Sequence, residues 1–249
     1  MINENMMPTA TLKVYQALAQ EEALRGVSLI GGTALSIQLS HRLSEDLDFF
    51  VLGDQLNSRA LDEMVNRMSA SHNVRLLTPT AKISQARING IDLLSQARDY
   101  AIDGVKVTIF ARNDQPYRYF NALGKSRYAN RTFDVMTSDA VFAMKSWLLQ
   151  KRVKSRDMFD LMKFMQKSGT PVSSIFSCAK EADPANYSEE LIKLTLTGEV
   201  PLDDDDEGFT SIGLQANVND IYRYFSALIN EYEVEFVYQQ QSKMRPDNG

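Results

Sequence analysis

Two aspartates separated by one residue, Asp46 and Asp48, have the type and spacing of metal ligands. They open the apolar run 46–51, which has the composition of a strand. On a strand, residues i and i+2 project from the same face, about 6.5–7 Å apart. Neighbouring carboxylates repel each other, and a divalent cation relieves that repulsion. We therefore expect Asp46 and Asp48 to hold Mg²⁺ (or Mn²⁺), which prefers carboxylate and phosphate oxygens.

A glycine pair precedes the aspartates and supplies a second element of chemistry. The apolar stretch 27–30 runs directly into Gly31-Gly32, which indicates a buried strand and a tight turn, and Thr33 is expected to cap a helix over residues 34–41. Glycine-turn amides and the positive end of a helix dipole both bind anions. Taken singly, each motif has an ordinary structural explanation, a turn or a surface strand end. Their combination forms a cradle for phosphate and metal, suited to in-line attack on a nucleoside triphosphate.

Composition narrows the class of protein that carries this cradle. Of the 249 residues, 44% are hydrophobic and 24% charged, which is typical of a globular chain. The single cysteine, Cys178, and only two histidines exclude a Cys-rich zinc module and disfavour a His-dominated metal site. The net charge of −5 argues against a general nucleic-acid coat but leaves room for a local basic patch. We see no signal peptide and no apolar run of about 18 residues, so we expect a cytoplasmic protein without a membrane span.

The elements that must position the cradle can be read from the periodicity. Short strands are expected at 74–77 and 82–89, followed by a hairpin of residues 95–102 and 105–110 around Asp103-Gly104, a strong turn signal. We place the end of a first domain, residues 1–124, near Gly124 and expect residues 125–249 to form a mainly helical domain.

The second half contains a cationic segment. Residues from about 138 to 168 are predicted to form one long helix, on which Lys145, Arg152, Arg156 and Asp160, spaced 7, 4 and 4, share a face. A positive face beside the carboxylates would neutralise triphosphate oxygens and the leaving pyrophosphate. The alternative is a solvated helix with Arg–Asp pairs such as Arg156 with Asp160. The acidic run 203–207 is predicted to be a solvated loop, and a last helix is expected from 218 to 231.

These motifs resemble a known family. The run GGTALSIQLSHRLSEDLDFF resembles the first motif of AbiEii/AbiGii-type nucleotidyltransferases, within the polymerase-β-like superfamily. The family's helical motif is matched, in order, by Asp139, Ala143-Met144-Lys145, Arg152, Arg156-Asp157 and Asp160-Leu161. The resemblance covers about residues 25–165. It implies an α/β core with a mixed sheet, followed by a helical domain.

The resemblance also implies an activity. The expected reaction is Mg²⁺-dependent transfer of a nucleotide from a nucleoside triphosphate to a hydroxyl acceptor. Members with an assigned target often act on the 3′ end of tRNA and are blocked by a partner antitoxin, so RNA and an antitoxin are the expected partners. On this basis the expected catalytic residues are Asp46, Asp48 and Lys145. The expected nucleotide-binding residues are Gly31, Gly32, Thr33, Arg42, Ser44, Lys145 and Arg156, with Thr108, Arg152, Asp157 and Asp160 in supporting positions.

One part of the superfamily pattern is missing from the sequence. A third carboxylate is usual on a neighbouring strand, where it often activates the incoming hydroxyl, but the corresponding position here is Thr108, which cannot act as a base at neutral pH. Three explanations are open: Asp103 or Asp92 supplies the carboxylate, the enzyme does without it, or the chain binds nucleotide without transferring it. The function therefore has two alternatives, a nucleotide- or partner-binding protein and a transferase acting on a small molecule or protein.

Overall fold

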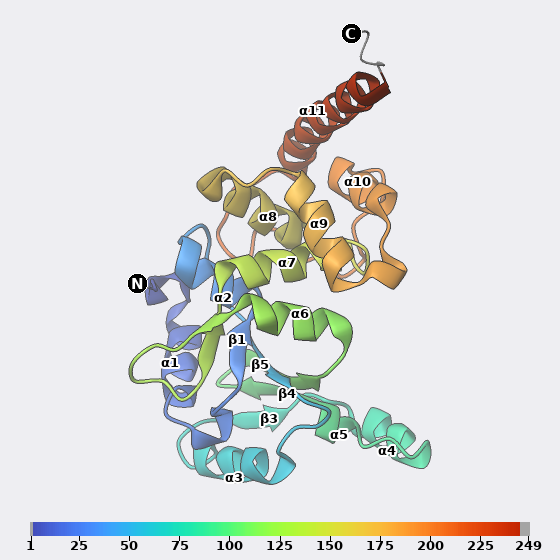
Figure 1. Cartoon of the computed structure of the whole chain (residues 1–249). Helices are drawn as coiled ribbons and strands as arrows, with labels where there is room; N and C mark the ends of the chain where they lie inside the picture. Colours follow the sequence, from blue (N-terminus) through green and yellow to red (C-terminus); the bar gives the residue numbers. More distant parts are fainter. Residues whose placement is uncertain (1, 245–249) are drawn as a thin grey trace. The chain divides into compact units, whose positions relative to one another are not determined.

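The computed structural model describes the backbone of residues 2–244, and the chain divides into two compact units, Met1–Val141 and Phe142–Gly249 (Figure 1). The boundary predicted at residues 124 and 125 precedes two strands, β6 (Lys125–Ser126) and β7 (Asp134–Met136). β7 pairs with β1 (Ser28–Ile30) and β6 with β7. Backbone hydrogen bonding within the sheet thus carries the first unit past the predicted boundary.

The first unit is built on a seven-stranded mixed sheet with the strand order β3-β4-β5-β2-β1-β7-β6. β2 is antiparallel to β1 and parallel to β5, and β1 is parallel to β7. The remaining strands are β2 (Leu47–Leu52), β3 (Val74–Leu76), β4 (Ala97–Ile102) and β5 (Val105–Arg112). The expected α/β core with a mixed sheet, followed by helices, is confirmed.

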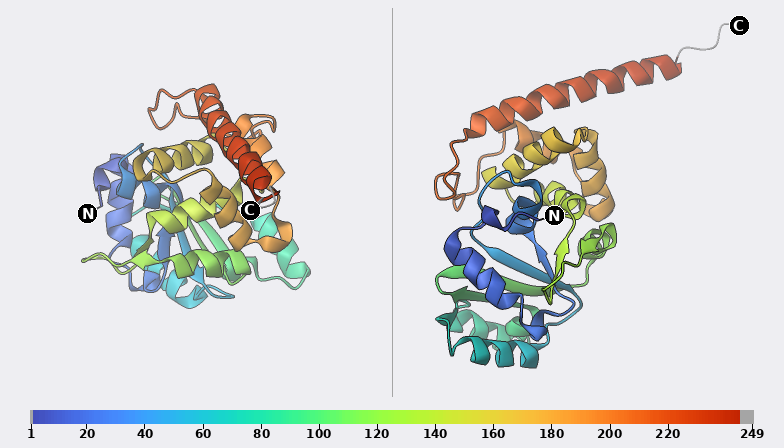
Figure 2. Two further views of the ribbon diagram at one scale, coloured as in Figure 1. Left: turned by 45° about the horizontal axis from the view of Figure 1, so that its top comes forward. Right: turned by 90° about the vertical axis from the view of Figure 1, so that its left-hand side faces the viewer.

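Helices lie on both faces of this sheet, and the right-hand view of Figure 2 shows the strands between α1 and α6. Phe49 and Phe50 point to opposite faces, as successive strand residues must. Phe49 packs edge-to-face on Phe133, with ring centroids 5.0 Å apart, whereas Phe50 contacts Tyr117 of α6 at 5.1 Å. The helices of this unit are α1 (Thr9–Leu18), α2 (Gly31–Leu39), α3 (Ser58–Met68), α4 (Thr80–Ile88), α5 (Leu93–Gln96) and α6 (Gln115–Leu123), with short 3₁₀ turns η1 (Glu4–Met6) and η2 (Glu22–Leu24).

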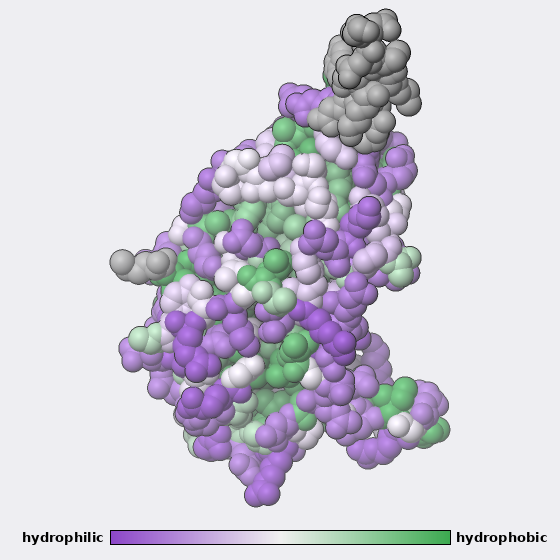
Figure 3. All heavy atoms as spheres, in the orientation of Figure 1, coloured by the Kyte–Doolittle hydropathy of each residue, from purple (hydrophilic) through white to green (hydrophobic). Residues whose placement is uncertain are grey.

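Two local predictions in this unit have opposite outcomes. The hairpin is confirmed: β4 and β5 are joined by Asp103 and Gly104, both at positive φ (48° and 85°), as a two-residue turn of this kind requires. The strand predicted at 82–89 is wrong, because this segment forms α4 and is rich in good helix formers such as Ala, Lys, Gln and Arg. Ile88, at the end of α4, is 78% exposed, and Figure 3 shows apolar atoms over this protruding segment.

The second unit is helical. α7 (Ser138–Leu148) contains the boundary between the units, and it is followed by α8 (Ser155–Ser168), α9 (Ser173–Ala182), η3 (Pro184–Asn186), α10 (Glu189–Thr197) and α11 (Val218–Met244). α11 is longer than the helix predicted over 218–231. Within the described part of the chain, no helix combines the length and the apolar content needed to span a bilayer.

Candidate active site

The glycine turn and Asp48 are in direct contact. β1 ends at Ile30, which pairs with Asp48 of β2, and α2 begins at once with Gly31. Gly31 has φ +69°, a backbone conformation that costs an L-residue about 1–2 kcal/mol. A methyl group on its Cα would lie 3.0 Å from Asp48 Oδ2, so the carboxylate is packed against the turn. The juxtaposition expected from the sequence is therefore present for Asp48.

Asp46 lies one residue before β2, because the strand begins at Leu47 rather than at Asp46 as predicted. Its backbone carbonyl accepts a hydrogen bond from the Thr33 hydroxyl, which also lies 2.8 Å from Ser44 Oγ. Thr33 and Ser44 are both buried. The threonine side chain thereby ties the first turn of α2 to the segment that leads into β2.

Thr33 does not cap a helix, contrary to the prediction. Because Gly31 adopts a left-handed conformation, the turn and the first helical turn merge, and α2 starts two residues before Thr33. The residue before the helix, Ile30, provides no side-chain cap. The first N–H groups of a helix have no acceptor within it. The amides of the glycine turn therefore carry the partial positive charge that makes such a helix end an anion site.

Arg42 and Ser44 pack against the second glycine. A methyl group on Gly32 would lie 2.6 Å from Arg42 Nη2 and 3.1 Å from Ser44 Oγ, so only glycine fits here without a shift of the arginine. Arg42 is 8% exposed and donates from Nη1 to the carbonyl of Leu43 at 2.8 Å. The structure thus gathers Gly31, Gly32, Thr33, Arg42, Ser44 and Asp48 around the N-terminus of α2.

The donor set fits a hard divalent cation that also binds phosphate. The described residues contain no group of three or more His, Cys, Asp and Glu side chains arranged to hold a metal ion. Asp46 and Asp48 are both half-buried, and the Asp48 carboxylate lies against the glycine turn at the start of α2. Mg²⁺ is commonly held by one or two carboxylates, with its remaining ligands from water and substrate phosphates.

A row of polar side chains crosses the sheet from Asp48. Asp48 pairs with Thr108 of β5, and Thr108 pairs with Asp99 of β4, so the three residues lie on the same face. The Thr108 hydroxyl donates to Asp99 Oδ1 at 2.9 Å. The predicted alternation of β5 is confirmed, with Val105, Val107 and Ile109 buried and Lys106, Thr108 and Phe110 more exposed.

Sequence reasoning missed Asp99, although the hairpin contained the signal. A two-residue loop at Asp103-Gly104 fixes the register, and the fourth pair back from that loop is Asp99 with Thr108. The two carboxylates considered instead lie elsewhere. Asp103, in the turn, binds His72 Nδ1 at 2.7 Å and the Asn73 amide at 2.8 Å, and the hydrogen bond to His72 lowers its pKa. Asp92 is an exposed residue at the N-terminus of α5.

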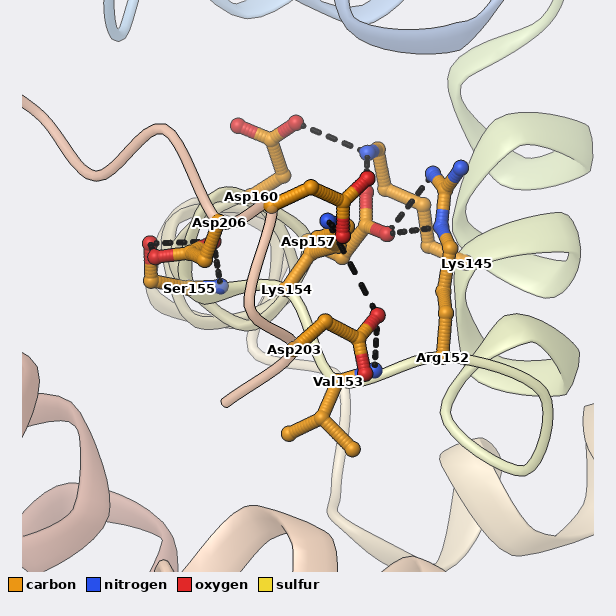
Figure 4. A network of polar contacts seen from close by, with 10 residues as sticks. Lys145, Arg152, Val153, Lys154, Ser155, Asp157, Asp160, Asp203 and Asp206 are labelled. Carbon is orange, nitrogen blue, oxygen red and sulfur yellow. Dashed lines mark hydrogen bonds and ion pairs between the residues drawn. The ribbon is translucent and has the colours of Figure 1, made fainter. Parts of the chain in front are cut away.

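In the second unit, Lys145 lies between two buried carboxylates (Figure 4). Its ammonium group pairs with Asp157 and, at 3.0 Å, with Asp160, and all three residues are at most 4% exposed. Arg152 donates to the other oxygen of Asp157 at 2.8 Å. Burial raises the pKa of Asp157, but attraction to Lys145 and Arg152 outweighs it, so the pKa is lowered overall. The network is a connected set of ion pairs in the core of this unit.

The continuous helix predicted across residues 138–168 is wrong. α7 ends at Leu148 and α8 begins at Ser155. In one helix, residues 12 apart would be separated by about 18 Å along the axis, too far for Lys145 to reach Asp157. The break lets α8 fold back, so that the ion pairs form between two helices instead of along one face.

The acidic run is not a freely solvated loop, contrary to the prediction. Asp206 accepts from the Ser155 amide at 2.9 Å and from its hydroxyl, which places a carboxylate at the N-terminus of α8. Lys154 pairs with Asp203 and Asp205. Arg156, expected to contact phosphate, donates to the Gly208 carbonyl at 2.6 Å and also pairs with Glu207. Figure 4 shows Asp203 and Asp206 directed toward residues 153–155.

Solved structures of other proteins share this fold. The chain is 17% identical to JHP933 from Helicobacter pylori, whose crystal structure aligns with a TM-score of 0.50 over 97% of both chains. It is 12% identical to MenT4, a nucleotidyltransferase toxin from Mycobacterium tuberculosis, with a TM-score of 0.50 over 90% of this chain and 86% of that one. These likenesses concern the fold.

Sequence comparison adds a relative and a family. An uncharacterized protein of Aquifex aeolicus (strain VF5) is 23% identical over 157 residues, or 61% of this chain, and the match spans 64% of that relative's length. The family model "Nucleotidyl transferase AbiEii toxin, Type IV TA system" matches residues 15–212, which include both motifs and the row through Asp99. The chain therefore belongs to the AbiEii family of nucleotidyl transferase toxins of type IV toxin–antitoxin systems.

Proposed function

We propose that this protein transfers a nucleotide from a nucleoside triphosphate to a hydroxyl group of RNA, with tRNA as the expected acceptor, in a reaction that requires Mg²⁺. The observation that carries the proposal is the contact between the Asp48 carboxylate and the Gly31 turn at the N-terminus of α2. A metal ligand and an anion site in contact are what a metal–triphosphate complex needs.

Each residue of the first unit has a defined part in this proposal. Asp46 and Asp48 hold the cation, which when bound stabilises charge on the phosphates. The amides of Gly31, Gly32 and Thr33 bind triphosphate oxygens, and Ser44 and Arg42 line the same turn. The hydroxyl of Thr33, bonded to the carbonyl of Asp46, fixes the distance between the two halves of the site.

Two cationic residues of the second unit, Lys145 and Arg156, are still predicted to bind phosphate. Lys145 remains a predicted phosphate contact, but it is buried and its ammonium group is held by Asp157 and Asp160, so it would have to leave one of these carboxylates to bind an anion. Arg156 would likewise have to leave its contacts with Gly208 and Glu207.

An antitoxin as the partner is supported by the matched family, whereas RNA as the acceptor rests on the resemblance of the two sequence motifs. A toxin of a toxin–antitoxin pair needs an essential cellular target, and its cognate antitoxin is the partner that such a system requires. Nucleoside triphosphates and tRNA are both cytoplasmic, so we expect the protein to act there.

The direct test is incubation of the purified protein with each labelled nucleoside triphosphate, Mg²⁺ and total tRNA. We expect label on RNA with the wild-type protein and none with the double variant Asp46→Ala and Asp48→Ala. Glu63→Gln, which removes an exposed carboxylate of α3, is the matched control and should retain activity. Labelling that survives the double substitution would exclude this site, and triphosphate binding without transfer to any RNA would favour a binding protein.

A further inference from the structure

A cleft opens beside the polar row, on the side away from the glycine turn. Its volume is about 720 Å³, and Asp99 and Thr108 line it together with the aromatic residues Phe110 and Tyr117, the cations Arg112 and Arg118 and the carboxylates Asp54 and Asp114. The strand order is β4-β5-β2-β1, and α2 follows β1. The anion site and this cleft therefore lie on opposite sides of Asp48, which suits in-line displacement with the nucleophile and the leaving group at opposite ends.

Asp99 lies two strands away from Asp48 on the same face of the sheet. The two residues are separated by β5, so their backbones are about 10 Å apart at ordinary strand spacing. A residue on the strand adjacent to β2 would lie about 5 Å from Asp48. The position of Asp99, half-buried at the wall of the cleft, suits a group that accepts a proton from the nucleophile.

We propose that the cleft receives the terminal nucleotide of the RNA acceptor and that Asp99 takes the proton from its attacking hydroxyl. This inference rests on the proposed function. The acceptor oxygen forms a bond to the α-phosphorus as its proton moves to an Asp99 carboxylate oxygen. The bond from that phosphorus to the bridging oxygen breaks, and pyrophosphate leaves with the electron pair. Phe110 and Tyr117 are the aromatic residues that a base would contact. Arg112, now 3.9 Å from Asp114, and Arg118, which donates to Asn113 at 2.9 Å, would turn to backbone phosphates.

Thr108 is a positioning residue in this scheme. Its hydroxyl donates to Asp99 Oδ1 and so fixes the rotation of the carboxylate, leaving Oδ2 to receive the proton. The threonine at the usual carboxylate position is then compatible with catalysis, because the carboxylate is supplied by the next strand.

The decisive substitution is Asp99→Asn, whose amide oxygen still accepts the Thr108 hydrogen bond but cannot take a proton at neutral pH. We expect kcat for labelling of tRNA to fall about 100-fold or more, within the usual range for loss of a general base, while the Kd for the Mg²⁺–triphosphate stays unchanged. Glu63→Gln is the matched control. In Asp99→Ala, added formate should restore part of the turnover, whereas it should not restore Asp48→Ala.

The cleft is tested separately by Arg112→Ala combined with Arg118→Ala. This variant should bind RNA more weakly, with the slope of log K against log salt reduced by about 1.4, and bind triphosphate normally. Arg59→Ala, an exposed arginine of α3, is its control. Equal turnover by wild type and Asp99→Asn would overturn the role of Asp99 alone, and unchanged RNA binding would overturn the cleft. A wild-type protein that binds triphosphate but labels no RNA would overturn the proposed function as well.

Discussion

The contact between Gly31 and Asp48 depends on the absence of one methyl group. Gly31 needs a positive φ, and its Cα lies against the carboxylate of the next strand. Gly26 also has a positive φ, +83°, but a methyl group there would meet nothing within 4 Å. Substitutions at the two glycines therefore distinguish the effect of backbone strain from the effect of contact with Asp48.

We predict that Gly31→Ala and Gly26→Ala lose similar stability but differ in activity. Each forces an L-residue into the left-handed region, at about 1–2 kcal/mol. Only Gly31→Ala also pushes against Asp48, and we expect its kcat/KM to fall about 10-fold or more. Urea unfolding and tRNA labelling measure the two effects. Equal activities of the two variants would contradict the assignment of Gly31 to the site.

Lys145 permits a second prediction at the same scale. Lys145→Met leaves Asp157 and Asp160 buried without their ammonium partner, and we expect a loss of about 3–5 kcal/mol. Lys180→Met, an exposed lysine of α9, should change stability by no more than about 0.5 kcal/mol.

The loss caused by Lys145→Met should depend on pH. In the wild type the folded-state pKa of Asp157 is lowered, so its contribution is present above the unfolded value of about 3.9 and disappears as pH falls through the folded value. Without Lys145, we expect burial and the neighbouring Asp160 to outweigh Arg152 and raise the pKa of Asp157, so that the stability contributed by the carboxyl is lost as pH rises. The free energy of unfolding should therefore differ more from wild type at pH 7 than at pH 5. The same difference at both pH values would contradict this account.

At the scale of elements, the break between α7 and α8 is stabilised by the acidic run, which caps the start of α8. Lys154, the residue before α8, provides no side-chain cap, and Asp206, 51 residues after Ser155, supplies the missing acceptor. The neighbouring charges of Lys154 and Arg156 are neutralised by the same segment. A run that looks like a solvated loop is thus the cap of a helix.

We predict that Asp206→Ala destabilises the protein by about 1 kcal/mol, with a range of about 0.5–2, because Ser155 loses its acceptor at the start of α8. Asp204→Ala removes an exposed carboxylate from the same run and should change stability by less than about 0.5 kcal/mol. Denaturant midpoints at constant m-value measure both. A loss of equal size in the two variants would mean that the run acts only through its net charge.

At the scale of the whole molecule, membership of a toxin family leads us to predict an effect on bacterial growth. Induced expression of the wild-type chain should arrest bacterial growth if it transfers nucleotides to an essential RNA. Asp48→Asn, expressed to the same level, should allow normal colony numbers, because one of the two carboxylates proposed to hold the metal is lost. Growth arrest by both proteins would indicate toxicity that does not depend on this site.

Much of the site could be predicted from the sequence because its parts are local. Gly31-Gly32 after an apolar stretch, the two aspartates before Phe49, and the Asp103-Gly104 hairpin each depend on neighbours within a few residues. Turn chemistry and strand alternation act over that range. The residue-level expectation that Asp48 faces the glycine turn followed from these two rules.

Tertiary structure alone decided which distant segments meet. The placement of β5 between β2 and β4 puts Asp48, Thr108 and Asp99 in one row, and no local rule specifies that strand order. The reversal after Leu148 lets Lys145 meet Asp157, and Asp206 returns to Ser155. Such contacts form only when burial of apolar surface compensates the entropy lost in closing long loops. Both quantities depend on the whole chain, so a local sequence pattern does not determine them.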